Sequence, residues 1–129
     1  RGVINYIILS AINGSRFTIY GDKDKEVRDY IFIEDAVNLL DFLIFYKQRE
    51  PKEVFNVCAG VGYSIQELID ATESITGRKI DFEERKADLG KQSHIGENKK
   101  ILELSGYKLA YNLGAGLNKT YSNYLEFYK

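Results

Sequence analysis

Two arginines beside predicted turns are the side chains best suited to chemistry in this sequence. Arg28 precedes an apolar run, and Arg85 opens the polar run Arg85-Lys86-Ala87-Asp88. A planar guanidinium group recognises phosphate oxygens through paired hydrogen bonds, so two arginines on convergent loops could clamp a diphosphate. The residues alone leave a second reading open, in which both arginines are solvated side chains of charged loops.

Other kinds of site find little support in the sequence. Gly60 and Gly62 lie between a predicted strand and a predicted helix, but Ile65 stands where a dinucleotide fingerprint needs its third glycine. His94 is the single histidine and has no partner at metal-ligand spacing. Cys58 is the single cysteine, which excludes an internal disulfide, and its apolar surroundings predict an inert thiol of raised pKa. These residues therefore predict no catalytic, cofactor or metal site in the chain.

Alternating strands and helices must position the two arginines, and this alternation predicts an α/β domain. Apolar spacing and capping residues predict helices over 3–12, 36–46 with Asp35 as its N-cap, 65–76 with the capping box Ser64–Glu67, 98–104 and 117–128. Strands are expected over 17–20, 30–33, 53–58 and 79–83, and a polar loop over 85–97.

Composition narrows the class of protein. The 129 residues include 18 Lys+Arg against 19 Asp+Glu, a balance that argues against a dedicated nucleic-acid binder. Apolar residues make up 44% of the chain, enough to bury the core of one domain. The longest apolar stretch is shorter than a membrane span and no signal-like segment precedes it, so we expect a cytoplasmic protein without membrane contact. Because the sequence contains no methionine, even at position 1, we expect a segment of a longer protein.

Several short motifs, in matching order, resemble the sugar-nucleotide epimerase/dehydratase branch of the extended short-chain dehydrogenase/reductases. They are Phe17-Thr-Ile-Tyr-Gly-Asp22, Val27-Arg-Asp-Tyr-Ile-Phe-Ile-Glu-Asp35, Val54-Phe-Asn-Val-Cys-Ala-Gly60 with Ser64-Ile-Gln-Glu-Leu68, Arg85-x-x-Asp88, and Leu104-Ser-Gly-Tyr-Lys108. The resemblance implies that residues 1–129 form the C-terminal nucleotide-sugar-binding part, a small mixed α/β substrate-binding lobe without its Rossmann domain. The implied activity of the intact protein is that of an NAD(P)-dependent epimerase or dehydratase, with a UDP-sugar 4-epimerase as the leading reading.

The resemblance also implies roles for individual residues. Arg28 and Arg85 match arginines that contact the diphosphate, and Asp88 matches the acid beside the ribose. The strand that borders the base is matched by Thr18, Ile19 and Tyr20. Three positions depart from the family pattern and leave the particular sugar undefined: Ala87 replaces a glycine, Gln92 a tyrosine and Gly96 an aspartate.

The chemistry of that family resides in a part that this sequence does not match. A Rossmann domain there binds NAD(P) and contributes a Tyr-x-x-x-Lys acid/base pair, whereas no tyrosine of this sequence has a lysine four positions on. We therefore expect no catalytic residue and no NAD or NADP bound by this chain itself. The expected partners are a nucleotide-diphosphate sugar, the protein's own N-terminal Rossmann domain and, in the intact enzyme, a second copy in a homodimer.

Two alternative functions, each of a different class, remain open. One is a non-catalytic family member that serves as a regulatory or scaffolding binding module. The other is a nucleic-acid module that uses the ten tyrosines and seven phenylalanines as stacking platforms. Most of these aromatic residues fall on apolar faces, so core packing is the favoured role for them.

Overall fold

The computed structural model describes residues 2–47, 52–85, 87 and 93–128 of the chain. Helices and strands alternate along these residues, which confirms the α/β class. The helices are α1 (Val3–Asn13), α2 (Ile33–Phe45), α3 (Ile65–Thr76), α4 (Lys99–Ser105) and α5 (Leu113–Phe127), and the strands are β1 (Phe17–Tyr20), β2 (Val27–Asp29), β3 (Gly62–Ser64), β4 (Phe82–Arg85) and β5 (Ser93–His94). No helix within the described residues is long and apolar enough to cross a bilayer.

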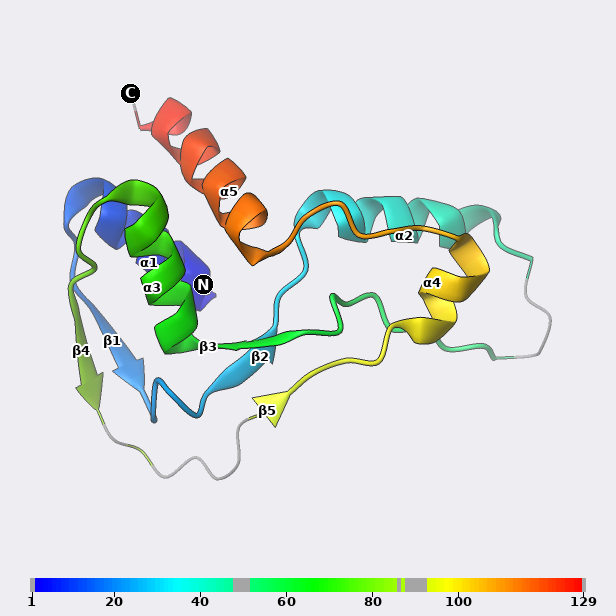
Figure 1. Ribbon diagram of the computed structural model, residues 1–129, viewed down its shortest axis with the longest axis horizontal. Coiled ribbons are helices and arrows are strands. Elements are labelled where there is room, and N and C mark those ends of the chain that lie inside the picture. The colour runs from blue at the N-terminus through cyan, green and yellow to red at the C-terminus, as the bar shows by residue number, and fades with distance from the viewer. Residues whose placement is uncertain (1, 48–51, 86, 88–92, 129) are drawn as a thin grey trace.

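The strands form two small sheets. β1 and β4 pair in parallel, with Phe17 opposite Phe82 and Tyr20 opposite Arg85. β2 lies between an antiparallel neighbour, β3, and a parallel neighbour, β5. Figure 1 shows the β1–β4 pair with α1 and α3 at one end of the molecule, α2 and α4 at the other, and β2 between them.

The main core lies where α3 packs against both α1 and α5 beside the β1–β4 pair. Its buried side chains are Ile7, Ala11, Ile19, Leu68, Ile69 and Ile80. Burial of aliphatic side chains of this size stabilises a small domain by roughly 1.5–3 kcal/mol each. At the other end α2 packs against α4, where Leu39 and Ile101 are buried.

Local signals placed several elements correctly. The helix expected over 3–12 ends at Asn13, and Gly14 follows in the left-handed conformation that a C-terminal cap requires. Ser64 and Glu67 form the expected reciprocal capping box at the start of α3, with Glu67 N to Ser64 Oγ at 3.1 Å. The strand over 17–20 is β1.

The strand expected over 30–33 is wrong. The strand is β2, three residues earlier, because its partners β3 and β5 lie opposite Val27–Asp29. The apolar run that follows enters α2 at Ile33 with Phe32 as its N-cap, so Asp35 is not the cap. The buried Asp35 carboxylate instead accepts hydrogen bonds from the Tyr107 hydroxyl and from the backbone N–H groups of residues 110 and 111, at 2.8–3.1 Å.

The strand expected over 53–58 is also wrong, because the described chain places no pairing strand beside it. Two backbone carbonyl groups of this segment accept hydrogen bonds from side chains instead. Lys100 Nζ donates to Val54 O at 3.3 Å, and Asn98 Nδ2 donates to Cys58 O at 3.0 Å. The strand expected over 79–83 is observed as β4, which begins three residues later, at Phe82, opposite Phe17 of β1.

Two further boundaries differ from expectation. The polar loop over 85–97 contains the short strand β5, and Arg85 is the last residue of β4. α5 begins at Leu113 rather than at Leu117, because the Asn112 side chain accepts from Ala115 N at 2.9 Å and caps the helix. The helix at 98–104 is α4, one residue displaced.

Candidate functional site

Arg28 lies in the middle of β2, with Tyr63 of β3 and His94 of β5 opposite it. Its guanidinium group is held on two sides: Nη1 donates to Val27 O at 2.9 Å, and Nη2 donates to Glu26 Oε2 at 3.1 Å. The Arg28 side chain is 36% exposed, whereas the Glu26 side chain is 11% exposed. The guanidinium group is therefore held by the protein, while about a third of the Arg28 side chain is exposed to solvent.

The carboxylate of Asp29, next to Arg28, ties three backbone positions to β2. It accepts hydrogen bonds from Ala59 N and Gly60 N, each at 2.8 Å, and from Gly96 N at 3.3 Å. These donors come from the turn before β3 and from the segment after β5. The strand that carries Arg28 is thus fixed to both of its flanking segments by one side chain.

The glycines near Arg28 serve close packing and do not fit a dinucleotide. A Cβ atom on Gly62 would lie 2.6 Å from Ile95 Cδ1 and 2.7 Å from Val27 Cγ1. One on Gly60 would lie 2.9 Å from Asn98 Nδ2. Side chains of this protein therefore fill the space beside this turn, and the turn does not fit a pyrophosphate.

Arg85 occupies a more open position at the end of β4. Its Nη2 lies 2.8 Å from Glu83 Oε1, and the two side chains are 63% and 36% exposed. Glu83 Oε1 also accepts from Thr18 Oγ1 of β1 at 2.9 Å. The Thr18 hydroxyl and then the Arg85 charge hold the pKa of the Glu83 carboxyl below its ordinary value.

The other residues that the resemblance singled out have different surroundings. Tyr20 lies opposite Arg85 in the β1–β4 pair and is 61% exposed. Ile19 is buried in the core, so its side chain supports the strand and only its backbone could face a ligand. Asp88 lies outside the described residues. Arg28 and Arg85 stand on different sheets, connected through the turn over 21–26.

Sequence reasoning missed Glu26 and Asp29, the two acids that flank Arg28. The sequence offered a signal, because Glu26 stands two residues before Arg28 and Asp29 directly after it. A strand over 30–33 instead puts these three residues in the preceding loop, where their spacing predicts no shared face.

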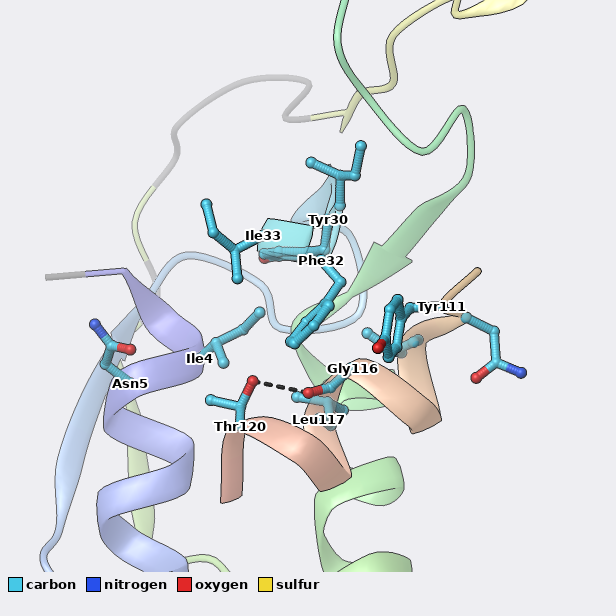
Figure 2. A pocket seen from close by; sticks show the side chains of 12 residues that line it. Ile4, Asn5, Tyr30, Phe32, Ile33, Tyr111, Gly116, Leu117 and Thr120 are labelled. Atoms are coloured by element: carbon cyan, nitrogen blue, oxygen red, sulfur yellow. Dashed lines mark hydrogen bonds between the residues drawn. The ribbon is translucent and has the colours of Figure 1, made fainter. Parts of the chain in front are cut away.

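Sequence reasoning also missed an apolar cavity of about 260 Å³ between the first turns of α1 and α5 and the entry to α2. In Figure 2, Phe32 and Tyr111 lie side by side in its wall, with ring centroids 4.4 Å apart. Its lining residues are Ile4, Asn5, Tyr30, Ile31, Phe32, Ile33, Tyr111, Asn112, Leu113, Gly116, Leu117 and Thr120. Neither arginine lines it, and its walls suit apolar packing rather than an anion.

The single cysteine and histidine have ordinary surroundings. Burial, and then the charge of Asp29, raise the pKa of the Cys58 thiol, in line with the inert thiol that the sequence predicts. Gly96 packs directly against Cys58 Sγ, which accounts for a glycine at that position. His94 is exposed on β5. Within the described ranges, no group of three His, Cys, Asp or Glu side chains could hold a metal ion.

The fold that positions these residues is found in the sugar-nucleotide branch of the extended short-chain dehydrogenase/reductases. MoeE5, in complex with UDP-glucose and NAD, superposes with a TM-score of 0.89 at 22% identity, over 99% of this chain and 42% of that chain. UDP-glucose 4-epimerase from Thermotoga maritima, in complex with UDP-glucose, gives a TM-score of 0.85 at 25% identity over 99% of this chain and 40% of that chain.

Among curated proteins, the similarity is to UDP-glucose 4-epimerases. UDP-glucose 4-epimerase from Lactobacillus helveticus is 34% identical over 87 residues, which are 62% of this chain and 26% of that enzyme. No family model matches the chain. The chain spans about a quarter of this relative's length and about two fifths of the solved structures. The family resemblance drawn from the motifs is confirmed: the curated relatives of this chain are UDP-glucose 4-epimerases, and the solved structures that share its fold include other epimerases and a dehydratase.

Proposed function

We propose that this chain is the C-terminal, nucleotide-sugar-binding part of an NAD(P)-dependent epimerase or dehydratase, and that the intact protein is a UDP-sugar 4-epimerase. The observation that carries the proposal is the similarity to UDP-glucose 4-epimerases. The surroundings of Arg28 support it, because an anion anchor needs an oriented donor: two protein acceptors hold this guanidinium group, and the side chain is 36% exposed.

In this proposal the chain supplies the grip on the substrate. Arg28 and Arg85 donate charge-assisted hydrogen bonds to the two phosphates, which are stronger than bonds between neutral groups. Thr18, Ile19 and Tyr20 border the base, and Asp88 faces the ribose. Pocket walls contributed by a second domain would complete the cleft, so the isolated chain should bind UDP weakly.

The oxidation and reduction of the sugar belong to the remainder of the protein. NAD or NADP, bound by an N-terminal Rossmann domain, would accept and return a hydride there. The similarity to MoeE5, which binds NAD, supports this assignment for the intact enzyme. This chain, without the acid/base pair, should not turn over a nucleotide sugar by itself.

Calorimetric titration of the full-length protein with UDP tests the proposal. Because a hydrogen bond to a charged group contributes roughly 1.5–3 kcal/mol, Arg28→Ala should weaken UDP binding by about 10- to 100-fold. Arg78→Ala is the matched control, since Arg78 is an exposed arginine just after α3 whose guanidinium donates to Ile12 O. UDP affinity of Arg28→Ala within twofold of wild type would refute the diphosphate grip. UDP binding without epimerase turnover would favour a non-catalytic family member.

A further inference from the structure

Two carboxylates are buried among the described residues, Asp35 and Glu26. Asp35 is accounted for, because three donors from the segment before α5 bind it. Glu26, at 8% exposure, makes its ion pair with Arg28. A buried ion pair often contributes no more stability than apolar side chains of similar size would, so stability alone does not explain why an acid stands at this position.

The backbone holds Glu26 in a defined place. Glu26 N donates to Asp22 O at 2.9 Å and closes the turn that precedes β2. This turn rests on the start of α3, where Gln66 N donates to Lys23 O at 3.2 Å. On the other side of Glu26, Val27 pairs with Ser64 of β3. The backbone at Glu26 is therefore anchored to α3 and to the central sheet independently of Arg28.

Glu26 immediately precedes β2 and lies two residues before Arg28, and the two side chains meet in an ion pair. Glu26 Oε2 accepts from Nη2 at 3.1 Å, while Val27 O accepts from Nη1 at 2.9 Å. Two acceptors on different guanidinium nitrogens fix both the position and the plane of the group. An arginine side chain without such support would have to give up its rotamer freedom when it binds a ligand.

We propose that Glu26 is a positioning residue for ligand binding: it holds the Arg28 guanidinium group in the orientation that receives a nucleoside diphosphate. This inference rests on the proposed function, and it adds a residue that does not itself touch the ligand. The negative charge of Glu26 acts against anion binding. The hydrogen bond from Arg28 to Glu26 favours anion binding, because it lowers the cost of ordering Arg28. The benefit of the hydrogen bond outweighs the cost of the charge.

Variants at position 26 separate these two effects in the full-length protein titrated with UDP. Glu26→Ala removes the acceptor and should weaken UDP binding by about 3- to 10-fold, the size of one neutral hydrogen bond. Glu26→Gln keeps an acceptor oxygen at the same reach without the charge and should stay within about threefold of wild type. If Glu26 acted only through its charge, both variants would bind UDP more tightly. Glu103→Ala, on α4, is the charge-matched control.

Three further comparisons separate positioning of Arg28 by Glu26 from other effects of the substitutions. Glu26→Asp keeps the charge but shortens the side chain by one methylene, so it should lose affinity like Glu26→Ala even if the alanine variant folds poorly. In an Arg28→Ala background, Glu26→Ala should cause no further loss. Normal UDP affinity of Arg28→Ala would overturn the proposed function itself. A large loss in Arg28→Ala together with wild-type affinity in both Glu26→Ala and Glu26→Asp would overturn only the role of Glu26.

Discussion

Arg28 and Arg85 have the same side chain and the same proposed ligand, but the structure supports them very differently. Arg28 lies on a central strand with a neighbour on each side, and its carboxylate partner Glu26 is 11% exposed. Arg85 ends one strand of a two-stranded pair, and its partner Glu83 is 36% exposed. The exposed fractions of the two arginines, 36% and 63%, follow the same order.

This difference teaches that a binding residue's environment, and not only its type, sets what it can contribute. A guanidinium group that is already ordered loses little entropy when it binds an anion, so more of the hydrogen-bond energy remains as affinity. A group in an exposed ion pair must be ordered on binding and is screened by water. The Arg28 region should therefore dominate both the stability and the affinity of the site.

The largest effect is expected at Asp29, which ties the Arg28 strand to its neighbours. Asp29→Ala leaves three backbone N–H groups without their acceptor and should lower the free energy of unfolding by about 2–4 kcal/mol. Urea unfolding followed by circular dichroism measures this change. Asp70→Ala, on α3, removes an exposed carboxylate that accepts from Gln66 Nε2 and serves as the control. Equal losses in the two variants would show that β2 is not held through Asp29.

The second effect compares the arginines directly. Arg28→Ala should weaken UDP binding by about 10- to 100-fold, whereas Arg85→Ala should weaken it by about 10-fold or less, because its environment orders it less. Lysine at position 28 should restore only part of the affinity, since an ammonium group lacks the planar pair of donors. Calorimetric titration of the three variants gives these values. An Arg85→Ala loss larger than that of Arg28→Ala would reverse the comparison.

The third prediction concerns the packing of side chains next to β5. Gly96→Ala places a methyl group against Cys58 Sγ and should destabilise the fold by about 1–3 kcal/mol, as overpacking of a filled site does. In a Cys58→Ala background the same change should be much less destabilising, because the sulfur is gone. Thermal unfolding of the four proteins measures the coupling. Gly114→Ala is the control, since its added methyl group meets little and the residue lies in α5. If Gly96→Ala destabilised the protein equally with and without the Cys58 sulfur, the contact with Sγ would not be the cause.

The smallest effect belongs to the exposed Arg85 region and depends on pH. The pKa of Glu83 is lowered in the folded protein by the Thr18 hydroxyl and then by Arg85. A lowered pKa means that ionised Glu83 stabilises the fold above its unfolded pKa, near 4.5, and that this contribution is lost as the pH falls through the folded value. Wild type should therefore be slightly more stable than Glu83→Gln at pH 7, with the gap closing below about pH 4. Melting temperatures between about pH 7 and pH 2.5 test this, and a constant gap would contradict it.

Local sequence determined the features of this fold that need only neighbouring residues. Gly14 and Gly77 end α1 and α3 because a left-handed residue is needed there, and both glycines have positive φ, at 72° and 66°. Ser64 and Glu67 start α3 through bonds that span three residues. The family is likewise indicated by short motifs, each of which is a run of neighbouring residues. These signals are readable because each is complete within a short stretch of chain.

Tertiary structure alone decided what depends on partners distant in sequence. β2 is three residues earlier than its apolar pattern suggested, because a strand forms where another strand can pair with it. Residues 53–58 have strand-like composition but meet the side chains of Lys100 and Asn98 instead of a pairing strand. Asp35 resembles a helix cap in sequence, yet it binds a segment more than 70 residues away. The contacts of Asp29 with Ala59, Gly60 and Gly96 span 30 to 67 residues and therefore leave no local pattern. The Glu26–Arg28 pair is close in sequence, but its place beside a central strand depends on where β2 finds its partners.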